Sequence, residues 1–129
     1  MAVTHIYVCT TCKLADEAGF AAADRSGARL HRALSALASE RQAPVEIVPV
    51  ECLSVCKRAC TVSFAAPGKW TYVYGDLSAD TGADIILDGA VLYGATSDGL
   101  IPWKQRPEAL KRGVVSRVPP MIKPSEKQP

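Results

Sequence analysis

Five cysteines fall into two groups, and this placement limits what the chain can fold into more than any other feature of its sequence. Cys9 and Cys12 form a C-x2-C motif near the start, and Cys52, Cys56 and Cys60 follow later at four-residue spacing. Thiolates are soft, anionic ligands that suit thiophilic metals and iron-sulfur clusters. A fold that brings the two groups together can therefore close a metal site.

A disulfide framework is a poor explanation for these cysteines. A chain of 129 residues, of which 48% are hydrophobic, can bury a substantial core without covalent cross-links. The cysteine count is odd, and a C-x2-C motif in a chain of this type indicates metal or redox chemistry. We therefore expect free thiols that bind a metal or a cluster.

The sequence gives no sign of export or of a membrane span. Residues 1–8 contain no basic leader and no long apolar segment. The apolar stretches are interrupted by Asp, Arg or Gly before they reach the roughly 18 residues that a membrane helix needs. We expect a cytoplasmic protein with no membrane partner, in a reducing compartment where thiolates stay free to bind metal.

Hydrophobic periodicity predicts the element order β-α-β-β-β-α. Runs rich in β-branched and aromatic residues predict four strands, over residues 3–8, 45–50, 61–66 and 70–74. Apolar residues at helical spacing predict two helices, over residues 27–39 and 79–93. Pro67, Gly68 and Lys69 form a turn between the last two strands, which therefore make a hairpin.

A strand-helix-strand unit followed by a hairpin and a helix is the order of a thioredoxin-like α/β fold. We expect a central mixed four-stranded sheet with flanking helices, in which the first two strands run parallel and the hairpin supplies the antiparallel pair. Both cysteine groups follow the carboxyl ends of the two parallel strands. Because such ends lie at one edge of a sheet, we expect the two groups to meet there.

Charge divides the chain into an acidic body and a basic end. Residues 1–103 carry 8 Lys/Arg and 11 Asp/Glu, whereas residues 104–129 carry 7 and 2. With many prolines in the second part, we expect one domain over residues 1–105 and a basic, Pro-rich, poorly ordered tail over 106–129. Such a tail can contact an acidic partner or nucleic acid. Without interleaved aromatic residues or a reader motif we expect a solubilising terminus and no nucleic-acid partner.

The thiol spacing leaves two kinds of centre open. Four thiolates suit one tetrahedral Zn²⁺, and two pairs suit the two irons of a [2Fe-2S] cluster. Structural zinc sites most often use two short knuckles, and the C-x3-C spacing of Cys52 and Cys56 is less typical of them, which favours iron-sulfur. Cys60 is a further candidate ligand, but it begins a predicted strand, where a free cysteine is a common small core residue.

Three cations stand beside the thiols in the sequence. Lys13, Lys57 and Arg58 could offset the negative charge of a thiolate site and keep the sulfurs deprotonated. They could equally be solvated loop residues. The sequence contains no Ser-His-Asp set of any specificity and no Gly-rich phosphate loop, so we expect no enzymatic activity from its side chains.

The run from Cys52 to Phe64, followed by residues 68–72, resembles the C-x3-C loop, strand and turn of thioredoxin-like [2Fe-2S] ferredoxins. The strand that ends at Cys9 is similar to theirs as well. Over residues 3–105 the chain also resembles a bacterial family of predicted metal-binding proteins of unknown function, often found beside cobalamin and cobalt-handling genes. The ferredoxin resemblance implies four ligands, with each pair serving one iron: Cys9, Cys12, Cys52 and Cys56.

This sequence departs from those ferredoxins at two points. Only Thr10 and Thr11 separate the first two cysteines, a shorter spacing than theirs, and Cys60 is an additional thiol. The C-x2-C motif of a thioredoxin-like fold could also indicate thiol-disulfide exchange. The motif here lacks a preceding Trp, and no proline directly precedes the third predicted strand, so we do not favour that chemistry.

Together these observations predict a small one-electron carrier with a [2Fe-2S] cluster. The resemblance implies service to cobalamin or cobalt metabolism, with a redox protein or enzyme as partner, and the sequence leaves a homodimer open. The alternative is a zinc- or cobalt-binding protein, either a structural site or a metal carrier, without a redox role.

Overall fold

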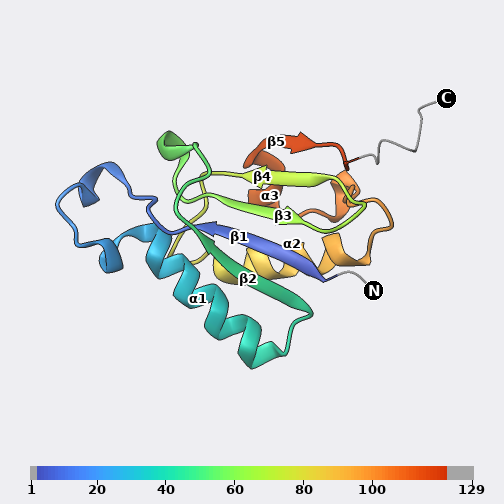
Figure 1. The fold of residues 1–129 in the computed structure, drawn as a ribbon, viewed down its shortest axis with the longest axis horizontal. Helices are drawn as coiled ribbons and strands as arrows, with labels where there is room; N and C mark the ends of the chain where they lie inside the picture. Colours follow the sequence, from blue (N-terminus) through green and yellow to red (C-terminus); the bar gives the residue numbers. More distant parts are fainter. Residues whose placement is uncertain (1–2, 122–129) are drawn as a thin grey trace.

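A five-stranded mixed sheet organises the fold (Figure 1). The computed structural model describes residues 3–121. Its strands lie side by side in the order β2-β1-β3-β4-β5. In chain order they are β1 (Thr4–Cys9), β2 (Val45–Val50), β3 (Val62–Ala65), β4 (Thr71–Tyr74) and β5 (Val114–Val118). β1 and β2 run parallel, and the pairs β1–β3, β3–β4 and β4–β5 are antiparallel.

Two amphipathic helices pack against each other and against β1, on one face of the sheet. α1 (Ser26–Arg41) buries Leu30, Leu34 and Ala38, which recur every four residues and therefore share one side of the helix. α2 (Ala83–Ala95) buries Ile86, Leu87, Gly89, Ala90 and Tyr93. A third, short helix is α3 (Glu108–Arg112), and single turns of 3-10 helix are η1 (Ala15–Glu17), η2 (Ala22–Asp24), η3 (Cys56–Arg58) and η4 (Trp103–Gln105).

The core between sheet and helices is aromatic. Phe64 on β3, Tyr72 and Tyr74 on β4, and Tyr93 on α2 are almost completely buried, with ring centroids 5.0 to 6.5 Å apart. The Tyr93 hydroxyl donates a hydrogen bond to the Trp70 carbonyl oxygen at 2.6 Å, which satisfies this polar group inside an apolar layer. The core thus ties α2 to the hairpin and fixes the sheet on which the cysteine segments lie.

The predicted order β-α-β-β-β-α is correct, and so is the parallel pairing of the first two strands. The predicted second helix begins too early, because residues 79–82 form a turn. In that turn the Ser78 hydroxyl oxygen accepts the N–H groups of Asp80 and Thr81, both at 3.2 Å. A serine side chain that bonds nearby backbone in this way competes with helix formation.

Residues 108–118 correct two predictions. The sheet does not have four strands, and these residues are not a poorly ordered part of a tail that begins at residue 106. These form α3 and β5, and β5 pairs with β4 as a fifth strand at the sheet edge. Leu110 is fully buried against the core and anchors the segment. In the sequence, the prolines and charges of this segment hide its tendency to fold. One buried leucine and the valines of β5 are enough to order the segment when an open sheet edge is available. The remainder of the expected tail, residues 122–129, lies outside the described residues.

None of the helices in residues 3–121 combines the length and the hydropathy that crossing a bilayer requires.

Replacing Leu110 by Ala tests whether α3 and β5 belong to the cooperative fold. The cavity left in the core should lower the free energy of unfolding by about 2–5 kcal/mol, measured by urea denaturation. Arg112→Ala is the matched control, because Arg112 is exposed and loses only a surface ion pair with Glu108, worth roughly 0–1 kcal/mol. Equal stability of the two variants would show that the segment is not part of the core.

Candidate metal centre

The carboxyl ends of β1 and β2 hold the two cysteine groups at one edge of the sheet. Cys9 is the last residue of β1 and lies opposite Val50, the last residue of β2. Cys12 follows Cys9 in the next loop, and Cys52 follows Val50 by two residues. The parallel register therefore delivers both thiol-bearing segments to the same place, as the sequence predicts.

Hydrogen bonds join the first cysteine loop to the second. The Thr10 N–H and hydroxyl both donate to the Val50 carbonyl oxygen, at 2.9 and 3.2 Å. The Cys9 thiol and the Thr11 hydroxyl both donate to the Glu51 carbonyl oxygen, the former at 3.5 Å. These contacts link residues some forty positions apart, and they hold Cys9 directly against the chain that leads to Cys52.

Cys52 and Cys56 form an exposed pair with their sulfur atoms 4.0 Å apart. The loop between them turns at Ser54, whose φ of 60° is left-handed and whose N–H donates to the Cys52 sulfur at 3.1 Å. Two thiolates on one tetrahedral metal with metal–sulfur bonds of about 2.3 Å lie about 3.8 Å apart. The second pair is therefore spaced to bind one metal ion together.

Cys9 and Cys12 are buried, with 1% and 3% of their surface exposed. Burial acts to raise the pKa of Cys9, but hydrogen bonding with Cys12, Thr11 and the Leu53 amide outweighs it, so the pKa of Cys9 is lowered. The pKa of Cys12 is raised to about 12, mainly by burial and further by the neighbouring Cys9. The Cys12 sulfur lies 3.3 Å from the Thr61 hydroxyl. Of the two thiols, Cys9 is the one with the lower pKa.

The two pairs also affect each other electrostatically. The pKa of Cys56 is raised, first by its hydrogen bond and charge interaction with Cys52 and also by the charge of Cys9. A negative charge on one pair therefore disfavours a second negative charge on the other. A bound cation would remove that conflict, since thiolates lose their protons on binding metal.

Cys60 has a different environment from the other four. It stands just before β3, is 1% exposed and lines a cleft of about 290 Å³ together with Ser26, Arg29 and Asp80. Burial, followed by the negative charge of Glu17, raises the pKa of its thiol to about 11. Cys60 therefore resembles a protonated core residue more than a ligand.

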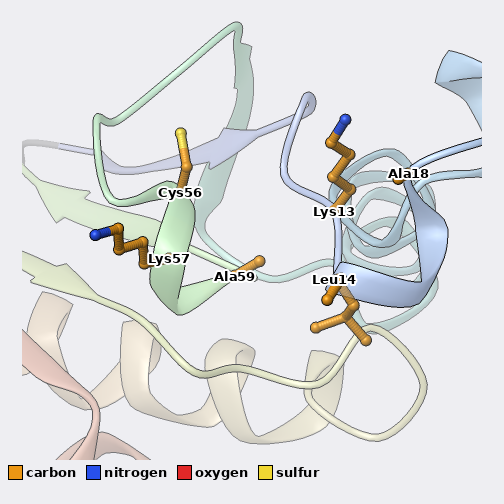
Figure 2. A pocket seen from close by; sticks show the side chains of 7 residues that line it. Lys13, Leu14, Ala18, Cys56, Lys57 and Ala59 are labelled. Carbon is orange, nitrogen blue, oxygen red and sulfur yellow. The ribbon is translucent and has the colours of Figure 1, made fainter.

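A second cleft, of about 340 Å³, separates the loop after Cys12 from η3 (Figure 2). Figure 2 shows Cys56 and Lys57 on η3 at one side of it and Lys13, Leu14 and Ala18 at the other. Of the three cations noted in the sequence, Lys13 and Lys57 line this cleft. Arg58 instead pairs with Asp76, with a nitrogen–oxygen distance of 2.6 Å, so its charge is compensated.

Sequence reasoning missed the buried carboxylate that holds the first cysteine loop. Glu17 accepts hydrogen bonds from the Leu14 N–H at 3.0 Å, from the Ser26 N–H at 3.1 Å and from the Ser26 hydroxyl at 2.7 Å, and it pairs with Arg29 at 3.1 Å. Ser26 is the first residue of α1, so Glu17 caps that helix and ties the loop to it. The spacing of three positions from Leu14 to Glu17 is the sequence signal that could have indicated this contact.

Gly27 allows the first cysteine loop to approach α1. Its N–H donates to the Cys12 carbonyl oxygen at 2.9 Å, and a Cβ at this position would collide with the Cys9 carbonyl oxygen. In the sequence, Gly27 is the first residue of the helix predicted over residues 27–39. The structure assigns it a packing role beside the thiols.

The cysteines are arranged in pairs, which fits a centre in which each metal ion takes two ligands from the protein. Within residues 3–121, no group of three or more His, Cys, Asp or Glu is placed to hold a single ion. Each iron of a [2Fe-2S] cluster takes two cysteine thiolates, so a preformed pair beside a second pair meets that requirement. Cys9 with Cys12 and Cys52 with Cys56 are the pairs that the fold supplies.

Replacing Glu17 by Gln tests the anchoring of this loop through pH. The pKa of Glu17 is lowered from 4.5 to about 2, first by the Leu14 N–H and then by the Ser26 hydroxyl. A carboxyl group with a lowered pKa stabilises the folded state at pH values above its ordinary pKa. This contribution is lost as the pH falls from about 4.5 toward 2. Urea midpoints from pH 7 to pH 2.5 should fall less steeply for Glu17→Gln, which should already be less stable at pH 7. Parallel curves for the two proteins would contradict this role.

Comparison with known proteins places the fold and the family. A search of curated proteins finds no match. Two solved structures are similar. One is a thioredoxin-like [2Fe-2S] ferredoxin from Aquifex aeolicus, with 18% identity and a TM-score of 0.59 over 95% of this chain and 100% of that chain. The other is a cysteine-to-serine variant of the thioredoxin-like [2Fe-2S] ferredoxin from the same organism, with 16% identity and a TM-score of 0.56 over 88% of this chain and 98% of that chain. At these identities the likeness shows a thioredoxin-like fold. The family described as "Protein of unknown function (DUF1636)" matches residues 6–120, and the chain therefore belongs to that family.

Proposed function

We propose that this protein binds a [2Fe-2S] cluster and carries single electrons to or from a partner protein. The observation that carries the proposal is the placement of two thiol pairs side by side at the ends of β1 and β2. The support from comparison is a fold shared with proteins that are named as [2Fe-2S] ferredoxins.

Cys9 and Cys12 would hold one iron, and Cys52 and Cys56 the other. The cluster, when bound, supplies a centre that accepts and releases one electron. Hydrogen bonds from the Ser54 N–H to Cys52, and between Thr61 and Cys12, spread the negative charge of the sulfurs. Such bonds tune the reduction potential of iron-sulfur centres.

The two pairs differ in their access to solvent. Cys9 and Cys12 are buried, whereas Cys52 and Cys56 are exposed. The exposed pair would be the side at which a partner approaches, with Lys13 and Lys57 beside it. Several points stay predictions. They are the identity of that partner, service to cobalamin or cobalt metabolism, a homodimer, a cytoplasmic location and the lack of enzymatic activity.

Protein purified without air tests the cluster directly. We expect visible absorption, about two irons and two sulfides per chain, and an EPR signal after reduction with dithionite. A protein that is colourless and EPR-silent, even after incubation with iron and sulfide, would refute the proposal. Native mass spectrometry showing one zinc or cobalt and no sulfide would select the metal-binding alternative.

Two buried cysteines provide a matched test of the ligand set. Cys12→Ser should remove most of the bound iron, because one iron loses a thiolate ligand. Cys60→Ser should leave iron content within about 20% of the wild type, because Cys60 lines the other cleft. Iron and sulfide analysis measures the difference, and circular dichroism checks that both variants fold. Equal loss from both would show that the ligand set is wrong.

A further inference from the structure

Both tryptophans of the chain lie on one cation-rich surface near the C-terminal end of the fold. We call it the cation–aromatic surface, formed by Trp70, Trp103, Arg106, Lys111 and Arg117. The Arg117 guanidinium lies 5.0 Å from the centre of the Trp70 ring. The Arg106 guanidinium and the Lys111 ammonium each lie 5.5 Å from the centre of the Trp103 ring. Trp103 is 59% exposed.

Tyr72 is buried beneath part of this surface, where it is adjacent to a cation of each tryptophan. Arg117 is opposite Tyr72 in the β4–β5 pairing, so their side chains share a face of the sheet, and Trp70 shares it because it precedes Tyr72 by two residues. Arg106 covers Tyr72, with its guanidinium 5.4 Å from the ring centre and a hydrogen bond of 3.1 Å to the hydroxyl. The Arg106 guanidinium also lies over the Trp103 ring, so Arg106 contacts both Tyr72 and Trp103.

Within residues 3–121, ion pairs leave the positive charge of this surface largely uncompensated. In the described part of the chain, no ion pair involves Arg106, Lys111 or Arg117. Glu108, the acidic residue of α3, already pairs with Arg112 at 3.0 Å. An acidic group from another molecule could therefore pair with these cations.

We propose that the cation–aromatic surface docks an acidic polypeptide segment of a partner protein. Trp and Arg are the residues that most often dominate protein–protein binding energy, and uncompensated cations steer an acidic partner toward them. Single-stranded nucleic acid fits less well. Its bases stack on open aromatic faces, whereas Arg106 and Lys111 already lie over the Trp103 ring where a base would stack.

The Trp70 part of this surface lies at the opposite end of the sheet from the thiols. Tyr72 is aligned with Phe64 on β3, and Phe64 with Ile6 on β1, so Trp70 lies near the start of β1. Cys9 lies at the other end of that strand. A partner docked on this surface would leave Cys52 and Cys56 uncovered. The inference therefore stands independently of the proposed electron transfer.

Intrinsic fluorescence tests the inference, because Trp70 and Trp103 are the two tryptophans of the sequence. The probe is poly-L-glutamate, titrated at low salt into the full-length protein. We expect a saturable change in tryptophan fluorescence that disappears at high salt, because exposed charge interactions are screened. Lys111→Glu and Arg117→Glu should each weaken the apparent affinity about tenfold.

Arg32→Glu is the matched control. It makes the same charge change at an exposed position on α1, away from the tryptophans, and should leave the affinity within about twofold. Absence of a fluorescence response, or equal weakening by Arg32→Glu, would overturn the proposal. Tighter binding of oligo(dT) than of poly-L-glutamate would overturn it in favour of nucleic acid. The titration needs no cluster, so its result is separate from iron and sulfide analysis.

Discussion

The parallel pairing of β1 with β2 is the interaction on which the rest of the site depends. The two strands are separated in sequence by α1 and its approach loop, yet their register places Cys9 opposite Val50. Hydrogen bonds from Thr10 and Thr11 continue the pairing beyond the last strand residue. Without this alignment the two cysteine groups would not meet, because the contacts of Glu17 and Gly27 tie the first loop only to α1 and not to the second loop.

The same fold gives the five thiols three environments. Cys52 and Cys56 are exposed and paired, Cys9 is buried but hydrogen-bonded so that its pKa is lowered, and Cys12 and Cys60 are buried with raised pKa values. These differences arise from burial and from neighbouring donors, because all five side chains are chemically identical. A site with one shielded and one open side is suited to hold a charged centre firmly while leaving it accessible.

The C-terminal segment shows how an open sheet edge changes the meaning of a sequence. Residues 108–118 carry many charges and lie between prolines, which is typical of a tail. They nevertheless become ordered, because Leu110 fills the core and β5 completes the backbone pairing of β4. The charges that seemed to mark a solubilising terminus are instead fixed beside Trp70 and Trp103. Of these two aromatic residues, Trp70 is supplied by a distant part of the chain, whereas Trp103 directly precedes the basic segment.

The sequence by itself determined the element order, the parallel first pair of strands and the convergence of the cysteine groups, because periodicity and strand polarity are local properties that β1, β2 and α1 carry in their own residues. It could not determine which thiols are buried, that Glu17 caps α1, that Gly27 must lack a side chain, or that a fifth strand exists. Those features depend on contacts between residues distant along the chain. Only the folded structure brings together the neighbouring groups that set the strength of a hydrogen bond, the pKa of a thiol and the ordering of an edge strand.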